Sequence, residues 1–365
     1  MTGAARIRGR AAQLDEAILS AAGLLAHSRS AVLAGLGTDM AGGTAVMRLA
    51  KRIGGVVDHM HADALLRDLG VMQQAGWIVT TPLQVRARAD MAVLVGGDVH
   101  AAPLGLDTPP TLRPDSRRCV VRLGTGPHAP SPTADASAVQ TIAADPPQLP
   151  MLLGVLRAVV AGRPVRADAP CLDALRDCAK RLKAAAFAVV VWSAGSLDAL
   201  AIEMLCGLID DLNATTRCAG LPLPAPDNAI GIAQVAASIS GFPPRVGFGR
   251  GRAEHDPWRF DAARMADSGE ADLAVWISAL TATPPPWAQN LPLIALVAPG
   301  TAFASPPEVE IIVGCPGTDH PGVMFDPTAG ALVCRSADPA ATRRPSVAEV
   351  VQRIDVAVQK VAAAC

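Results

Sequence analysis

A short apolar strand, a turn of small residues and a helix follow one another twice in this 365-residue chain. In the first copy, the apolar run 31–36 leads through a glycine-rich turn to a helix that includes 46–53, and two glycines end that helix before a strand at 56–58. In the second copy, the run 187–192 precedes a helix that Ser196 can cap. Strands and helices in this alternation are typical of βαβ units. The sequence therefore predicts an α/β fold with a parallel sheet and three layers.

The remaining elements are predicted from short apolar runs and from capping residues. Further buried strands are expected at 91–95, 119–123, 274–278, 294–297 and 311–313. The segment 12–28 repeats apolar residues at helical spacing, which predicts an amphipathic helix. Near the other end, Ser346 and Glu349 have the spacing of a capping box, so a terminal docking helix is predicted after them.

The length and the positions of the prolines predict two α/β halves. A chain of this length corresponds to about two domains. Ten prolines lie between Ala101 and Pro150, and we expect this segment to be a surface excursion that joins the halves. The predicted division is a first half over 1–150, with the Pro-rich excursion at 101–150, a second half over 151–340 and the docking helix over 341–365.

Charge and composition exclude several classes of partner. The chain has 32 Lys and Arg against 33 Asp and Glu, so no basic field exists to hold nucleic acid or an anionic membrane. Aromatic residues are only 3% of the chain, which leaves few side chains for base stacking. The longest uncharged run, 273–307, contains seven prolines and cannot form an unbroken spanning helix. No signal peptide is visible and no CxxC pair occurs, so we expect a cytoplasmic protein that binds neither nucleic acid nor membrane.

The densest group of potential ligands follows the predicted strand at 56–58. It consists of Asp58, His59, His61 and Asp63. A His-x-His pair on a strand points both rings to one side, and Asp63 could complete a metal site. No other histidine is placed beside the group by spacing, so we favour a polar strand-end loop without a metal. The carboxyl end of a strand is where α/β proteins bind ligands, so a residual pocket is expected here.

Two other segments are weaker candidates for ligand binding. The glycine-rich turn 35–43 follows a strand, but its spacing is not GxGxxG, which favours a structural turn over a dinucleotide site. The clearest basic segment contains four arginines separated by glycines: Arg245, Arg250, Arg252 and Arg259. Guanidinium groups on a flexible loop suit carboxylates and phosphates, which makes Arg250 and Arg252 a candidate anion loop. We favour the alternative that these arginines pair with Glu254, Asp256 and Asp261 or line a subunit contact.

Several segments together resemble the B subunit of formylmethanofuran dehydrogenase, a member of the molybdopterin oxidoreductase superfamily. They are AVLAGLGTDM to RADMAVLVGGDVHAAP from Ala31 onward, Asp211-Leu212-Asn213, Asn228–Gly241, Gly241-Phe242-Pro243 through Phe260, and Gly317–Arg335. The similarity extends from about residue 12 to 335, and the order of the motifs is more specific than any one of them. The resemblance implies three-layer parallel-sheet domains of molybdopterin-oxidoreductase type, reduced in size.

The chain departs from the dehydrogenases of that family in its sulfur ligands. By this resemblance, a working dehydrogenase would carry an N-terminal cysteine cluster for an iron–sulfur centre. It would also carry a Cys or selenocysteine for molybdenum or tungsten soon after the Gly-Gly-Val-x-Asp strand. This chain has no cysteine before Cys119, and the stretch 59–66 contains none. Iron–sulfur clusters need thiolates. We therefore expect that both the molybdopterin and the iron–sulfur cluster are lost, and that the chain has no catalytic residues.

A B subunit without these ligands resembles that of the bacterial formyltransferase/hydrolase complex of methylotrophs. The resemblance implies a non-catalytic subunit in one-carbon metabolism, where formyl-tetrahydromethanopterin gives its formyl group to a methanofuran-type carrier and formate is released on sister subunits. The implied partners are a formyltransferase, an amidohydrolase-like hydrolase and a third structural subunit. Two alternatives stay open: a formylmethanofuran dehydrogenase-like oxidoreductase or hydrolase with a residual site near Asp58–Asp63, and the central domain of a thiamine-diphosphate enzyme. So short a chain weakens the second.

Overall fold

The computed structural model describes residues 5–364 except 116, 126–139, 288–290 and 342. The chain forms two compact units. Unit 1 comprises Met1–Ala62, Pro226–Phe325 and Leu332–Cys365, and unit 2 comprises Asp63–Ala225 and Asp326–Ala331. Each unit has a sheet with parallel central strands between helices, so the predicted α/β class with three layers is confirmed.

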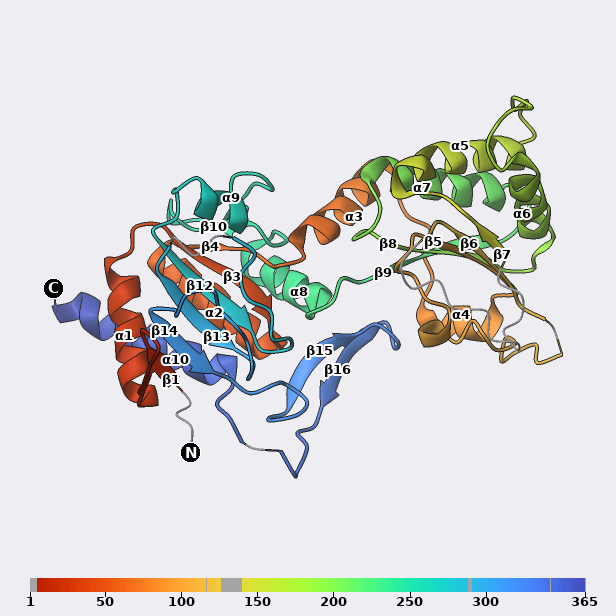
Figure 1. Ribbon diagram of the computed structural model, residues 1–365. Coiled ribbons are helices and arrows are strands. Elements are labelled where there is room, and N and C mark those ends of the chain that lie inside the picture. The colour runs from red at the N-terminus through yellow and green to blue at the C-terminus, as the bar shows by residue number, and fades with distance from the viewer. Residues whose placement is uncertain (1–4, 116, 126–139, 288–290, 342, 365) are drawn as a thin grey trace. The chain divides into compact units, whose positions relative to one another are not determined.

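Unit 1 is built on a nine-stranded sheet (Figure 1). Its five central strands are parallel and lie in the order β4 (Val56–Val57), β3 (Ala31–Gly37), β12 (Leu273–Ser278), β13 (Leu293–Val297) and β14 (Val309–Ile312). Antiparallel strands extend both edges: β10 (Val246–Gly247) and β11 (Glu254–His255) beside β4, and β1 (Ala5–Ile7) and β2 (Arg10–Ala12) beside β14. Every residue of β3, β12 and β13 is buried, because helices or loops cover both faces of the sheet.

Helices cover the sheet of unit 1 on both faces. One face packs against α1 (Leu14–His27), α2 (Met40–Ile53), α8 (Ala229–Ser240) and α10 (Val347–Ala364). On the other face lie α9 (Ala262–Asp267) and Trp287. Trp287 meets Trp276 of β12 edge to face, with ring centroids 5.3 Å apart. Two apolar cores, one on each side of the sheet, therefore hold unit 1 together.

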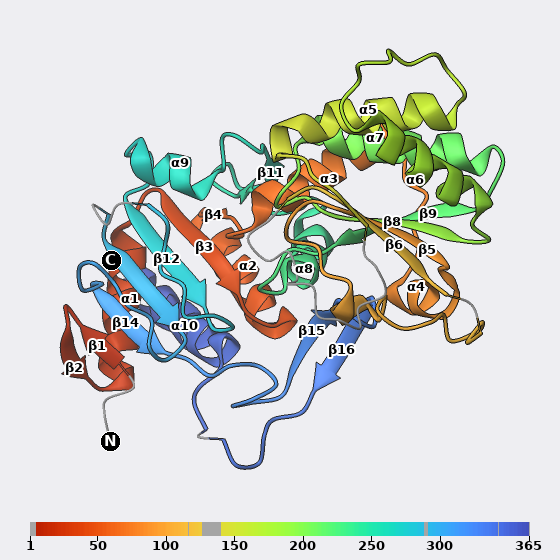
Figure 2. The ribbon, with the colours of Figure 1, turned by 45° about the vertical axis from the view of Figure 1, so that its right-hand side comes forward.

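Unit 2 has a five-stranded sheet that is parallel throughout (Figure 2). Its order is β7 (Gln140–Ile142), β6 (Cys119–Leu123), β5 (Met91–Val95), β8 (Ala188–Ser193) and β9 (Cys218–Leu223). One face packs against α3 (Ala62–Ala75), α5 (Leu149–Val160), α6 (Leu172–Ala184) and α7 (Ala199–Asn213), and the other against α4 (Pro82–Arg88). The chain runs outward from β5 in both directions, as in a doubly wound fold.

Smaller elements complete the structure. Two 3₁₀ helices, η1 (Ala102–Leu104) and η2 (Pro146–Gln148), lie in the Pro-rich segment. A separate hairpin is formed by β15 (Gly322–Asp326) and β16 (Ala331–Arg335). In the part of the chain that the structure describes, no helix is both long and apolar enough to cross a bilayer. The uncharged run 273–307 instead supplies two central strands, β12 and β13.

Most predicted elements occur where the sequence placed them, and the capping box before α10 is present. The backbone N–H of Glu349 donates to the Ser346 hydroxyl at 3.1 Å, and the N–H of Ser346 donates to the Glu349 carboxylate at 2.8 Å. The prediction that Ser196 caps the next helix is wrong. The Asp198 carboxylate caps α7 by accepting from the N–H of Ala201 at 2.7 Å.

The structure divides the chain differently from the predicted linear halves 1–150, 151–340 and 341–365. β12 pairs with β3, so residues after 226 complete the sheet of unit 1, and α10 packs on α1 and α2 within the same unit. The excursion 101–150 gives β6 and β7 to the sheet of unit 2; its residues 126–139 lie outside the described part of the chain. Strand pairing between distant segments, which no local pattern encodes, sets these boundaries.

Candidate functional site

A cluster of polar side chains lies at the carboxyl ends of β3, β4 and β12 in unit 1. We call it the strand-end cluster; its members are Thr38, Asp39, Asp58, His59, His61, Asp227, Asn228 and Thr281. β4 and β12 lie on opposite sides of β3. The chain therefore reverses direction across the sheet at β3, and open α/β sheets bind ligands at such a point. This is the end of the sheet where the sequence predicts a residual pocket.

Asp58 follows β4 and is buried. One carboxylate oxygen, Oδ1, accepts from the N–H of His59 at 2.8 Å, and Oδ2 accepts from the N–H of Ala262 at 2.9 Å. Nε of Arg245 lies 3.4 Å from Oδ1. Burial raises the pKa of Asp58 to about 7, and Arg245 and the two N–H groups oppose this rise. Asp58 thus ties the start of α9 and the Arg245 segment to the end of β4.

Both ring nitrogens of His59 are used within the chain. Nδ1 lies 3.0 Å from the N–H of His61, and Nε2 lies 3.1 Å from the carbonyl oxygen of Asp227. These partners assign the tautomer with the proton on Nε2, because Nδ1 must accept. Burial lowers the pKa of His59 to about 4, so the ring is neutral at physiological pH. Neither nitrogen has a lone pair available for a metal ion.

His61 is half-buried and pairs with a carboxylate. Its Nε2 lies 3.0 Å from Oδ2 of Asp227, whose Oδ1 accepts from the Thr281 hydroxyl at 2.9 Å. Burial by itself would raise the pKa of Asp227, but the hydrogen bonds from His61 and Thr281 hold it below its usual value. This carboxylate therefore stays ionised and orients the imidazole.

The backbone at Asp227 and Asn228 is in the left-handed region, with φ of 55° and 60°. This conformation is uncommon for residues other than glycine. The Asn228 side chain stabilises it: Nδ2 donates to the carbonyl of Thr38 at 2.8 Å, and Oδ1 accepts from the N–H of Phe325 at 2.9 Å. The turn that presents Asp227 to the histidines is thus held by hydrogen bonds from two other segments.

The structure does not bring all four predicted residues into one ligand set. Asp63 lies in the first turn of α3, in unit 2. Over the described ranges of the chain, no three His, Cys, Asp or Glu side chains are grouped so that they could hold a metal ion. Asp227 and Thr281 belong to the cluster but carry no local sequence signal, since Asp227 is 166 positions from His61. The pairing of β12 with β3 brings Thr281 there, and the packing of α8 against α2 brings Asp227.

The start of α2 does not fit the phosphate of a pterin or dinucleotide cofactor. Helix N-termini bind such anions through free backbone N–H groups. Here the Asp39 carboxylate caps α2 and accepts from the N–H of Gly42 at 2.9 Å. The Met60 methyl group would lie 3.2 Å from a Cβ placed on Gly37, so it covers the turn after β3. The segment after β4 also supplies no thiolate, so the donor set does not suit molybdenum or tungsten.

The arginines of the basic segment pair with acids. Arg245 is buried and contacts Asp261, as the alternative interpretation expected. It also contacts Asp58, which that interpretation did not name. Three exposed arginines share the Glu254 carboxylate: Arg252 at 3.4 Å, Arg250 at 3.5 Å and Arg259 at 3.8 Å. The exposed arginines of this segment thus share one carboxylate, which agrees with the expected pairing with Glu254.

Comparisons with known proteins show which proteins the chain is similar to. No protein-family model matches it. It is 36% identical over 347 residues to the B subunit of the formyltransferase/hydrolase complex Fhc from Methylorubrum extorquens, and the match covers 93% of each chain. It is 24% identical over 249 residues to the B subunit of the tungsten-containing formylmethanofuran dehydrogenase 2 from Methanocaldococcus jannaschii, and this match covers 64% of this chain and 56% of that protein.

A solved structure agrees with the sequence comparison. It is the crystal structure of the formyltransferase/hydrolase complex (FhcABCD) from M. extorquens in complex with methylofuran. One of its chains superposes with a TM-score of 0.87 and 34% sequence identity, over 98% of this chain and 99% of that chain. Because the sequence identity is 36% and the match covers 93% of both proteins, the chain belongs to the family of the Fhc B subunit.

Proposed function

We propose that the chain is the structural B subunit of a formyltransferase/hydrolase complex in one-carbon metabolism. The observation that carries the proposal is the end-to-end match to the Fhc B subunit, in sequence over 93% of both chains and in structure over 99% of a chain of FhcABCD. In this proposal a formyltransferase and an amidohydrolase-like hydrolase are sister subunits. They move a formyl group from formyl-tetrahydromethanopterin to a methanofuran-type carrier and release formate, and a third sister subunit is structural.

We propose further that this chain contributes no catalytic group and no redox cofactor. A general acid or base must be within hydrogen-bond reach of the substrate. In the strand-end cluster, His59, Asp58 and Asp39 are buried, and the ring nitrogens and carboxylates each contact groups of the same chain. The carboxylate at the start of α2 and the lack of a thiolate after β4 support the loss of molybdopterin.

One observation favours the alternative of a residual enzyme. His61 is the histidine of the strand-end cluster that solvent reaches, with 32% of its side chain exposed, and it is oriented by an ionised carboxylate. A His–Asp pair of this kind can transfer protons. An enzyme with a residual site near Asp58–Asp63 would therefore depend on His61 more than on His59.

Substituting His61→Ala tests the two functions against each other. We expect the complex assembled with the sister subunits to release formate at a rate within about twofold of the unsubstituted complex, because the side chain supports no chemical step. His59→Ala is expected to behave alike once assembled, and His27→Ala, on the exposed end of α1, is the matched control. A loss of about 100-fold or more in turnover with assembly intact would establish the enzyme instead.

A further inference from the structure

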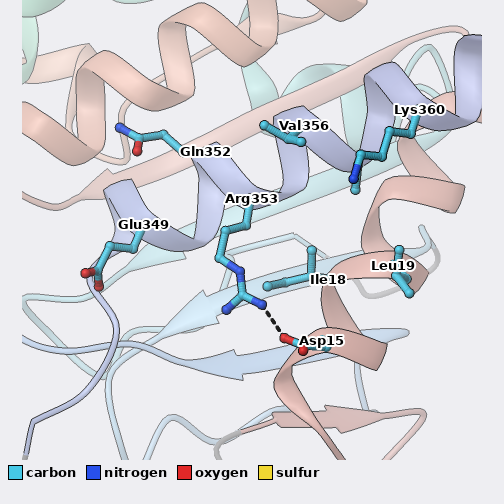
Figure 3. A pocket seen from close by; sticks show the side chains of 9 residues that line it. Asp15, Ile18, Leu19, Glu349, Gln352, Arg353, Val356 and Lys360 are labelled. Carbon is cyan, nitrogen blue, oxygen red and sulfur yellow. Dashed lines mark hydrogen bonds and ion pairs between the residues drawn. The ribbon is translucent and has the colours of Figure 1, made fainter.

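An apolar groove lies between α1 and α10 on unit 1, with a volume of about 510 Å³ (Figure 3). Its floor includes Ile18 and Ala357, which are buried. Leu19 is 63% exposed and Val356 is 52% exposed, so two branched aliphatic side chains stand in solvent beside this floor. Grouped exposed apolar side chains of this kind, bordered by charged residues, mark interaction sites.

The charges along the groove follow a regular order on α10. Glu349 and Lys360 lie at its two ends, about three helical turns apart and so on the same side of the helix (Figure 3). Arg353 lies between them and is paired with Asp15 of α1. Among the described residues, Lys360 has no ion-pair partner. The groove thus presents a negative end, an apolar centre whose one charged pair is neutralised, and a positive end.

We propose that this groove is the contact between two copies of the chain, with their α10 helices antiparallel about a two-fold axis. In that arrangement Glu349 of each copy lies opposite Lys360 of the other, and Val356 and Leu19 of both copies pack at the centre. A two-fold contact requires a surface that is complementary to itself. The order negative, apolar, positive meets this requirement when the helices are antiparallel, whereas parallel helices would place like charges together.

A charge-swap experiment on the full-length chain tests this contact. Light scattering during size-exclusion chromatography is expected to give twice the 37.4 kDa mass of the chain. Glu349→Lys and Lys360→Glu, made singly, place like charges opposite each other and should each raise the dissociation constant of the dimer at least about tenfold. The double variant restores opposite charges in the dimer and should return the constant to within about threefold of the original. This rescue is specific to pairing between identical chains.

Two further variants keep the test independent of folding. Glu349→Lys also removes a capping partner of Ser346, so Val356→Asp is used as a second disruption: half of this side chain is already exposed, and the monomer should fold. Val356→Asp is expected to give monomers with unchanged circular dichroism, while Lys180→Glu on α6 in unit 2 should leave the dimer intact. The proposal is overturned by a monomer at every concentration, by a double variant as weak as the singles, or by a dimer that survives Val356→Asp.

Discussion

Replacing Asp58 with alanine is expected to destabilise unit 1 by about 3 kcal/mol, one of the largest effects of any single change outside the apolar cores. The side chain is 5% exposed and accepts from the N–H groups of His59 and Ala262. Its loss leaves these buried donors unsatisfied and removes a carboxylate from the buried guanidinium of Arg245. Urea unfolding at neutral pH measures the effect.

The size of the loss in unfolding free energy distinguishes a buried network of hydrogen bonds and ion pairs from an exposed ion pair. Arg245 keeps Asp261 as a partner, so we expect the low end of the range for a broken buried ion pair. Asp58→Asn should cost less, because one amide oxygen can still accept. The matched control is Arg252→Ala, an exposed arginine near Glu254, which should change stability by less than about 0.5 kcal/mol. Equal effects of Asp58→Ala and Arg252→Ala would contradict the structure.

The free energy of unfolding of the unsubstituted chain minus that of the His59→Asn variant is expected to fall by about 2 kcal/mol between neutral pH and about pH 5. Burial lowers the pKa of His59 from 6.5 to about 4. Between these values the unfolded chain binds a proton that the folded chain does not, so the stability that this side chain contributes is complete above about pH 6.5 and is lost as the pH falls. Urea unfolding of both proteins across this range checks it.

The comparison with His59→Asn isolates this one group. Asp58, whose pKa is raised to about 7, favours the folded state as the pH falls and would mask the effect in the unsubstituted chain alone. His61 and Asp227 also face the imidazole ring of His59. Asp58, His61 and Asp227 are the same in the unsubstituted chain and in His59→Asn. If the two pH profiles run parallel, His59 is not buried as the neutral tautomer with both nitrogens bonded.

The sequence was sufficient to predict the sheets but not how the two units are divided. Strands such as 91–95 and 187–192 are continuous apolar runs because both faces of a parallel sheet are covered, and this pattern is local. The pairing of β12 with β3 joins segments that are more than 200 residues apart. Neither composition nor residue spacing indicates that pairing, so a linear division of the chain at residue 150 could not take it into account.

The candidate site shows the same limit on a smaller scale. Asp58, His59 and His61 were predicted because they follow one strand directly. Their hydrogen-bond partner Asp227 comes from the turn before α8, and its role depends on a left-handed backbone that nothing in the local sequence requires. Ser196 and Asp198 are both good helix caps two positions apart, and only the structure decides between them.

Elemental analysis of the intact complex, purified with its sister subunits, tests the central claim most directly. That claim is a B subunit of formyltransferase/hydrolase type whose residues no longer hold a redox cofactor. We expect molybdenum, tungsten and iron each well below one atom per copy of this chain, with no pterin released on denaturation. Molybdenum or tungsten in a one-to-one ratio with this chain, accompanied by a pterin, would contradict it.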